Sequence, residues 1–100
     1  MPILHSLQHS DDEQLWFQHC LDSVQHCDAI ILLEDAVNIC SHLPTIERLT
    51  SLNLELRLFV IDVDVEARGL LNNILPPFEV VSYQDFVELS LEYEKLINWA

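Results

Sequence analysis

The sequence of 100 residues contains a single glycine, Gly69. Phosphate-binding loops of the dinucleotide and Walker types need several positions without a Cβ atom, where the backbone can approach a phosphate or adopt positive φ values. One glycine cannot supply these positions. Nucleotide binding through either kind of loop is therefore excluded.

Basic residues are almost as scarce as glycine. Four lysines and arginines stand against seventeen aspartates and glutamates, which gives a formal net charge of −13. Because affinity for nucleic acid depends largely on cations that neutralise phosphates, we expect no direct nucleic-acid binding by this chain. The acidic surface fits either general solubility or a more basic protein partner.

Long apolar runs are missing as well. No run approaches the roughly 20 residues of a membrane-spanning helix, and no signal-peptide pattern opens the chain, so we expect no membrane association. The cysteines are odd in number: Cys20, Cys27 and Cys40. Free thiols in a chain without an export signal predict a reducing, cytoplasmic location.

The most informative stretch that is present is Ala29–Leu33, an apolar run of strand length without polar alternation. Such a run is typical of a strand that is buried on both faces of a parallel sheet. Glu34 and Asp35 follow it directly. In open parallel sheets, ligands and partners bind just outside the carboxyl ends of the strands, so this stretch predicts both a fold and a working surface.

Strand and helix patterns alternate along the rest of the chain. Strands are expected at Pro2–Leu7, Ala29–Leu33, Leu54–Ile61 and Phe78–Val81. Helices are expected after the capping sequence Ser10–Glu13, at Ala36–Cys40, from Pro44 through Leu49, at Val65–Leu70, and after a second cap at Ser82–Asp85. This alternation predicts an α/β fold, a single three-layer α/β/α domain over residues 1–100 with a mainly parallel sheet of about four to five strands.

The last predicted helix has two features that the structure can test. Phe86, Val87 and Leu91 are expected on one apolar face, and Lys95 is expected deep in the same helix. A receiver-type domain would need acids after its first strand and a lysine after its last, and neither requirement is met. The strand-end acids are therefore assigned to solvated turns and caps; they are Glu34, Asp35, Asp62 and Asp64.

Cys20 is the first candidate for chemistry. Helical spacing places it on the apolar face of the first helix, where a cysteine is usually a small buried hydrophobe. A reactive thiol needs a helix N-terminus or a nearby cation, and no Lys, Arg or His occupies the i±3 or i±4 positions of Cys20. The sequence shows no intrinsic activation of this thiol.

Two His-Cys pairs, at His19–Cys20 and His26–Cys27, suggest a metal site. Seven residues of helix rise about 10 Å, so the two pairs cannot share one ion while the helix persists. The spacing also matches no zinc clip. We therefore expect no metal and no other cofactor.

Several stretches together resemble one small family, the DsrH/TusB group of the DsrE-like superfamily. Ile3–Leu7 is similar to its Leu-His-(Thr/Ser)-Leu start, and Leu32–Val37 to its strand-end motif. Ala67–Leu70 matches its Ala-Arg-Gly segment, and Val81–Val87 with Trp99 resembles its closing helix and tail. The likeness covers nearly the whole chain in order. One departure is Ala36, where the family commonly has glycine.

The resemblance implies a DsrEFH-like fold and a role in sulfur relay. Family members assemble with TusD/DsrE-like and TusC/DsrF-like chains into a heterohexamer that passes persulfide sulfur to an acceptor of the TusE/DsrC kind. In one branch the sulfur ends in the thiolated wobble uridine of tRNA, and in the other it serves dissimilatory sulfur oxidation. We expect the tRNA branch, because it is the more widespread use of the fold.

The resemblance also supplies site residues. Cys20 matches the first-helix cysteine of the sulfur-oxidation branch and is a candidate persulfide carrier, although some members of the tRNA branch lack it. Either a partner chain activates this thiol on assembly, or another subunit carries the principal thiol and Cys20 is structural; we favour the second. Glu34, Asp35 and Arg68 are expected near strand ends, facing a neighbouring subunit. The alternative is a non-catalytic module that only shapes the complex.

Overall fold

A computed structural model describes residues 2–8, 15–52 and 54–99 of the chain. Its centre is one sheet of five strands in the order β4-β3-β2-β1-β5, and every pair of neighbours runs parallel. The strands are β1 (Ile3–Leu7), β2 (Ala29–Leu32), β3 (Arg57–Ile61), β4 (Phe78–Val81) and β5 (Lys95–Asn98). The predicted parallel sheet is confirmed.

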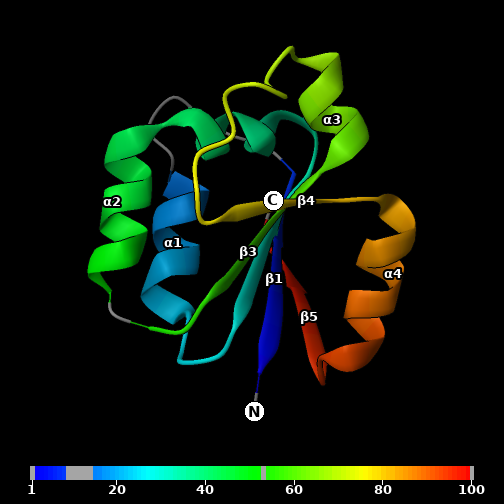
Figure 1. The fold of residues 1–100 in the computed structure, drawn as a ribbon. Coiled ribbons are helices and arrows are strands. Elements are labelled where there is room, and N and C mark those ends of the chain that lie inside the picture. Colours follow the sequence, from blue (N-terminus) through cyan, green and yellow to red (C-terminus); the bar gives the residue numbers. More distant parts are fainter. Residues whose placement is uncertain (1, 9–14, 53, 100) are drawn as a thin grey trace.

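Helices cover both faces of this sheet (Figure 1). They are α1 (Leu15–Ser23), the 3-10 helix η1 (Glu34–Ser41), α2 (Leu43–Ser51), α3 (Asp62–Ala67) and α4 (Tyr83–Glu92). Helices α1 and α2 lie on one side, α4 lies on the other, and α3 sits beyond the carboxyl ends of the strands. This arrangement is the α/β/α fold that the sequence predicts.

The sheet separates two apolar cores, because successive side chains of a strand point to opposite faces. The larger core packs Leu7, Ile30 and Leu32 against residues of α1, η1 and α2. The smaller core packs Ile31 and Phe59 against Leu89 of α4. All four residues of β2 are buried, as expected for the central strand. No helix in the described part of the chain is long and apolar enough to cross a membrane.

The end of the chain differs from the prediction. Lys95 does not lie in the last helix; it begins β5, which pairs with β1 through the register Ile3↔Lys95. Helix α4 ends at Glu92, and Tyr93 already has extended backbone angles of φ −97° and ψ 144°. A four-residue strand next to a helix is hard to recognise, because its pairing partner lies at the other end of the sequence.

The buried face of α4 also differs. Leu89 is buried against the sheet, with Phe86 and Tyr93 packed beside it. The spacing i, i+3 and i+7 is that of one helix face. Val87 and Leu91 were expected there, but they are 59% and 81% exposed. Of the three residues that the sequence placed on the apolar face, only Phe86 therefore packs against the sheet.

Most predicted element boundaries differ from the observed ones by a residue or two, and two starting points differ by three. Strand β3 begins at Arg57 rather than Leu54, and α3 begins at Asp62 rather than Val65. Gly69 follows α3 with φ +67°, the left-handed conformation that a glycine favours after a helix. The first predicted cap, Ser10–Glu13, lies outside the described residues.

The second predicted cap is confirmed at the start of α4. The Ser82 hydroxyl accepts a hydrogen bond from the Asp85 N–H at 3.1 Å, and the Asp85 carboxylate accepts one from the Ser82 N–H at 3.1 Å. This reciprocal pair is a capping box, which satisfies two backbone donors that the helix itself leaves unpaired. It fixes where α4 begins.

Removing this cap should lower stability measurably. We expect Ser82→Ala to decrease the free energy of unfolding by about 1 kcal/mol, because the Asp85 N–H loses its acceptor. For a domain of this size that corresponds to a decrease in Tm of about 4–8 °C. Thermal unfolding followed by circular dichroism measures it. Ser90→Ala, in the same helix, is the control and should change Tm by much less; equal decreases would contradict the capping role.

Candidate functional site at the carboxyl edge of the sheet

The structure brings Asp35 and Arg68 together at the carboxyl edge of the sheet. Asp35 lies in η1, which follows β2, and Arg68 follows α3, which follows the neighbouring strand β3. The Arg68 guanidinium donates to Asp35 Oδ1 from Nη2 at 2.8 Å and from Nε at 3.3 Å. Glu34, the first residue of η1, lies at the same edge. All three residues therefore lie at the carboxyl edge of the sheet, and their role facing a neighbouring subunit stays a prediction.

Asp64 connects these residues, and sequence reasoning missed its role. Its Oδ2 accepts a hydrogen bond from the Glu34 N–H at 2.9 Å and another from the Tyr83 hydroxyl at 3.1 Å. Arg68 Nη1 donates to the backbone carbonyl of Asp64 at 3.1 Å. The sequence analysis assigned Asp64 to a solvated turn. Its place at the end of a strand adjacent to β2 was the signal that could have found it.

We call Glu34, Asp35, Asp64, Arg68 and Tyr83 the edge cluster. It contains a strained residue, since Glu34 adopts φ +48°. A left-handed conformation costs a residue with a Cβ roughly 1–2 kcal/mol. The hydrogen bond from the Glu34 N–H to Asp64 opposes that cost. Such strain is concentrated at functional sites, where it holds a side chain in a defined position.

The environment of the edge cluster raises the pKa of Tyr83. Partial burial raises the pKa of its phenol, and the hydrogen bond to Asp64 and the negative charges of Asp64 and Glu34 raise it further, while Arg68 opposes the shift. Tyr83 therefore stays a hydrogen-bond donor at neutral and mildly alkaline pH. The cluster thus presents carboxylates, a guanidinium and a phenol that can exchange hydrogen bonds and charge with another protein.

Cys20 lies away from this edge, in the larger core. Its side chain is fully buried, and burial followed by the nearby charge of Asp28 raises its pKa to about 12. A thiol in that state is almost entirely protonated at neutral pH, as a packing role requires. Its role as a persulfide carrier stays a prediction. Cys40 is also buried, with a pKa raised by burial, whereas Cys27 is exposed.

A buried polar network beside Cys20 was not predicted. The Asp28 carboxylate accepts hydrogen bonds from the Ile3 N–H at 2.9 Å and the Gln25 N–H at 3.0 Å, and Asp28 Oδ2 lies 2.9 Å from His5 Nε2. Trp99 Nε1–H donates to His5 Nδ1 at 2.9 Å. An indole N–H can only donate, so His5 Nδ1 is an acceptor and Nε2 carries the hydrogen toward Asp28.

This network ties β1 to the turn before β2 and to the residue after β5. Burial alone would raise the pKa of Asp28, but the hydrogen bonds from His5, Ile3 and Gln25 outweigh that effect and hold the pKa below its ordinary value. The carboxylate is therefore charged across the neutral range. The contacts span much of the chain, with a sequence separation of 94 between Trp99 and His5, so no local pattern could reveal them.

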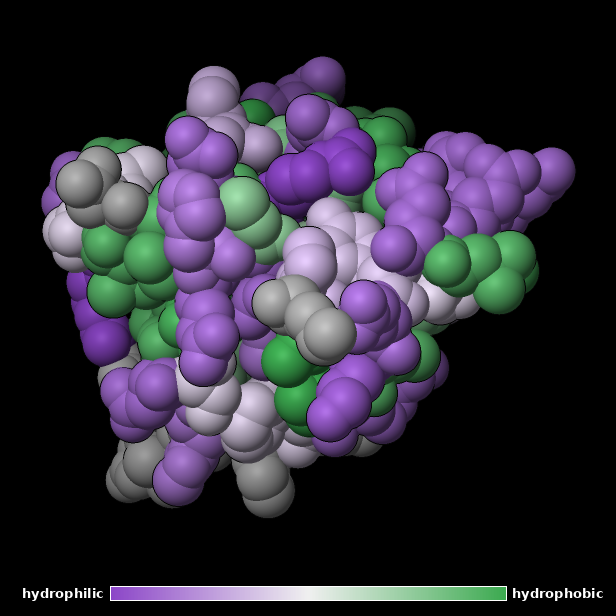
Figure 2. All heavy atoms as spheres, turned by 90° about the horizontal axis from the view of Figure 1, so that it is seen from below, coloured by the Kyte–Doolittle hydropathy of each residue, from purple (hydrophilic) through white to green (hydrophobic). Residues whose placement is uncertain are grey.

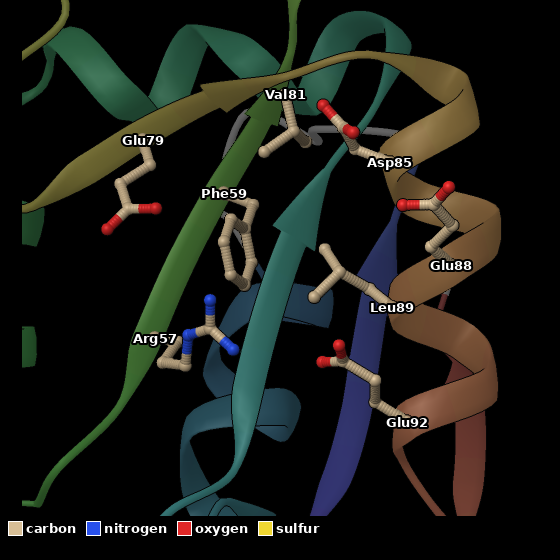
Figure 3. A pocket seen from close by; sticks show the side chains of 8 residues that line it. All are labelled: Arg57, Phe59, Glu79, Val81, Asp85, Glu88, Leu89 and Glu92. Carbon is tan, nitrogen blue, oxygen red and sulfur yellow. The ribbon is translucent and has the colours of Figure 1, made fainter.

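The α4 side of the sheet carries a shallow groove of about 200 Å³ (Figure 3). Phe59, Val81 and Leu89 supply its apolar lining, and Arg57 lies 4.9 Å above the Phe59 ring in a cation–π contact. Four carboxylates surround them: Glu79, Asp85, Glu88 and Glu92. An acidic groove with apolar walls suits a basic side chain of a partner, because the aliphatic stem and the charged end find matching surfaces.

Comparison with known proteins identifies relatives. Residues 9–96 match the family described as DsrH like protein. The chain is 34% identical to protein TusB of Yersinia enterocolitica over 101 aligned residues, which cover 97% of this chain and 96% of that protein.

Two solved structures have a similar fold. The crystal structure of the YchN protein from E. coli covers 98% of both chains with a TM-score of 0.76 and 14% identity. A protein of unknown function from Methanobacterium thermoautotrophicum covers 97% of both chains with a TM-score of 0.73 and 14% identity. At such identity, the likeness to these two structures concerns the fold alone.

Proposed function

Since this chain belongs to the DsrH/TusB family, we propose that it is a small subunit of a cytoplasmic sulfurtransferase complex that relays persulfide sulfur for the 2-thiolation of the wobble uridine in tRNA. The observation that carries the proposal is the similarity to a TusB protein along 97% of this chain. The partners would be TusC/DsrF-like and TusD/DsrE-like subunits in a heterohexamer. A TusE/DsrC-like protein would accept the sulfur.

Two surfaces support a role in assembly. The edge cluster presents Asp35, whose side chain is 64% exposed, beside Arg68, which is 27% exposed. The groove along α4 presents four further carboxylates. Together with the net charge of −13, these surfaces favour a partner with basic patches, since complementary charge guides docking and register.

The state of Cys20 supports a secondary place in the chemistry. In a relay step, a thiolate attacks the outer sulfur of a donor persulfide, a new persulfide forms, and the donor cysteine leaves as a thiolate. The attacking group must be both exposed and deprotonated. Cys20 is buried and has a pKa of about 12, so we assign the principal thiol to another subunit.

The test is co-purification of the tagged chain from its source organism, followed by native mass spectrometry. The proposal expects a hexamer that contains two copies each of this chain and of two other chains. Recovery of the chain alone, or with unrelated proteins, would leave the fold and the family standing but overturn the assembly. Intact mass then shows whether any sulfur is carried by this chain.

Arg68→Glu tests the edge cluster as an interface. The substitution removes the hydrogen bonds to Asp35 and places a negative charge beside Asp35 and Asp64, so we expect binding to the partner subunits to weaken by at least about tenfold. Native mass spectrometry of the co-expressed subunits measures it. Lys95→Glu, the same charge reversal at the amino end of β5, is the control. An undiminished yield of hexamer with Arg68→Glu would remove Arg68 from the interface.

Two considerations favour alternative functions for this chain within the same family. By its resemblance to the family, Cys20 matches the first-helix cysteine of the sulfur-oxidation branch, which favours a subunit of that pathway. Its burial favours a non-catalytic module that shapes the complex. Cys20→Ser tests whether this chain carries sulfur or only shapes the complex. Undiminished sulfur transfer by the assembled complex supports the module, whereas loss of transfer with assembly intact supports a carrier.

A further inference from the structure

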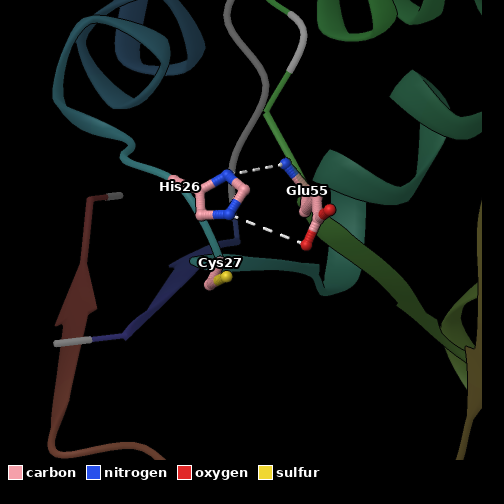
Figure 4. A group of neighbouring side chains, drawn as sticks. All are labelled: His26, Cys27 and Glu55. Carbon is pink, nitrogen blue, oxygen red and sulfur yellow. Dashed lines mark hydrogen bonds and ion pairs between the residues drawn. The ribbon is translucent and has the colours of Figure 1, made fainter.

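A second group of chemically active side chains lies at the opposite edge of the sheet. His26, Cys27 and Glu55 each offer one ligand atom, and these atoms all lie within 4.8 Å of one another. It is the one such group of three or more His, Cys, Asp or Glu side chains among the residues that the structure describes. Figure 4 shows the imidazole, the thiol and the carboxylate on two segments that are far apart in the sequence.

The fold itself brings these segments together. His26 and Cys27 precede β2, and Glu55 precedes β3. The two strands are parallel neighbours in the register Ala29↔Arg57, so the residues just before them meet at the amino edge of the sheet. Figure 2 views the molecule from this side, where hydrophilic side chains are spread over much of the surface. An ion and water can reach the group there.

From this geometry we propose that His26, Cys27 and Glu55 bind one zinc ion. Imidazole and thiolate are ligands that zinc prefers, and a carboxylate completes a set of three that leaves the fourth tetrahedral position for water. The inference stands independently of the sulfur-relay role. It departs from the expectation of no metal, which considered only the two His-Cys pairs along one helix and did not include Glu55.

The distances between the three ligand atoms fit a tetrahedral zinc site after a small rotation of the side chains. In tetrahedral zinc sites, neighbouring ligand atoms lie about 3.5 Å apart, given the usual zinc–ligand bond lengths. His26 Nε2 and Glu55 Oε2 are already 3.6 Å apart. Their side chains are 60% and 80% exposed, so rotation about exposed bonds can bring the Cys27 sulfur closer.

Binding changes the protons of the site in a defined way. Zinc needs the lone pair of His26 Nε2, so the ring hydrogen moves to Nδ1, and the weak 3.5 Å hydrogen bond from the Glu55 N–H to Nδ1 is lost. The Cys27 thiol releases its proton to the buffer and binds as a thiolate. The carboxylate of Glu55 binds without a proton change.

The backbone conformation of Cys27 makes one substitution, Cys27→Gly, especially informative. Cys27 has φ +70°, a conformation that glycine adopts without strain. Cys27→Gly therefore removes the thiol while the folded state is preserved. The matched controls are His19→Gln and Glu47→Gln, which remove a histidine and a glutamate outside the group.

The experiment is titration of the full-length chain with zinc chloride, followed by calorimetry and thermal unfolding. We expect one equivalent to bind, and Tm to rise by about 10 °C or more at a free zinc concentration about 100 times Kd. Cys27→Gly and Glu55→Gln should each lose most of this rise, and the two controls should keep it. Cobalt in place of zinc should give a thiolate-to-metal absorption band that is absent from Cys27→Gly.

Two results would overturn the proposal. One is no binding of zinc to the wild-type chain. The other is a zinc-dependent rise in Tm that is unchanged in Cys27→Gly, since the ion would then be bound by other groups. Because Cys27→Gly is expected to fold in the absence of metal, its own Tm without zinc distinguishes loss of the site from loss of the fold.

Discussion

Replacement of Asp28 by alanine is expected to lower the free energy of unfolding by about 3–5 kcal/mol, because each buried donor that is left without an acceptor costs about 1–3 kcal/mol. Three donors lose their acceptor at once: the Ile3 N–H, the Gln25 N–H and His5 Nε2–H. All belong to a network whose central side chains, His5 and Asp28, are each 1% exposed. A natural domain has a total stability of about 5–15 kcal/mol, so the substitution should remove a large share of the stability and shift unfolding to much lower urea concentrations.

Urea unfolding followed by fluorescence and circular dichroism measures this loss. Asp22→Ala is the matched control, because it also removes one negative charge but from an exposed position. Surface substitutions of this kind usually change stability by about 0.5 kcal/mol or less. If the two variants unfolded at similar urea concentrations, the network would not hold the fold together as the hydrogen bonds indicate.

The same network predicts a dependence on pH. Folding lowers the pKa of Asp28, so its charged form is favoured in the folded state. The resulting stabilisation is present above the ordinary pKa of about 3.9 and is lost as the pH falls through the folded-state value. Asp28→Asn should therefore reduce the dependence of unfolding free energy on pH below about pH 4. An unchanged acid dependence would contradict this assignment.

Alkylation of Cys20 in the folded chain should be slower than that of an ordinary thiol by about two to three orders of magnitude. Burial raises its pKa from 9.0 to about 12, which lowers the thiolate fraction at neutral pH by that factor, and thiolate is the reacting form. Iodoacetamide labelling at neutral pH, followed by peptide mass spectrometry, measures the rate. The exposed Cys27 is the internal reference.

Labelling in urea provides the control, because the two cysteines should react at similar rates once the chain is unfolded. Equal rates in the folded chain would contradict the burial of Cys20 and strengthen its role as a carrier.

The raised pKa of Cys20 also affects stability at alkaline pH. The neutral thiol is favoured by folding, so its stabilisation is complete below about pH 9 and is lost as the pH rises toward 12.

The parts of the fold that the sequence predicts well are those with strong local patterns. The apolar run of β2, the proline in the first turn of α2 and the capping box of α4 each depend on a few neighbouring residues. Strand β5 and the inward face of α4 depend on which surfaces meet in the folded chain. Phe86 and Tyr93 face the sheet because Leu89 between them does, and this choice cannot be read from hydrophobicity when Val87 and Leu91 are also apolar.

The residues of the candidate site also differ in how well the sequence alone predicts them. Glu34 and Asp35 could be found because they directly follow a recognisable strand. Asp64 and Tyr83 could not be assigned to them, since their contacts cross from one βα unit to another. The group of His26, Cys27 and Glu55 requires knowledge that β2 and β3 are adjacent. Spacing along one helix therefore could not predict it.

The pairing of β1 with β5 determines when the sheet can be completed during synthesis of the chain. β1 lies inside the sheet, but the strand on one side of it comes from residues 95–98, and Trp99 donates to His5 across 94 residues. At about 5–20 residues per second, the ribosome makes this last strand several seconds after the first. Until then one edge of β1 lacks its partner, and His5 lacks the indole that fixes its tautomer. The nascent chain thus exposes a strand edge to chaperones until residues 95–99 have left the ribosome.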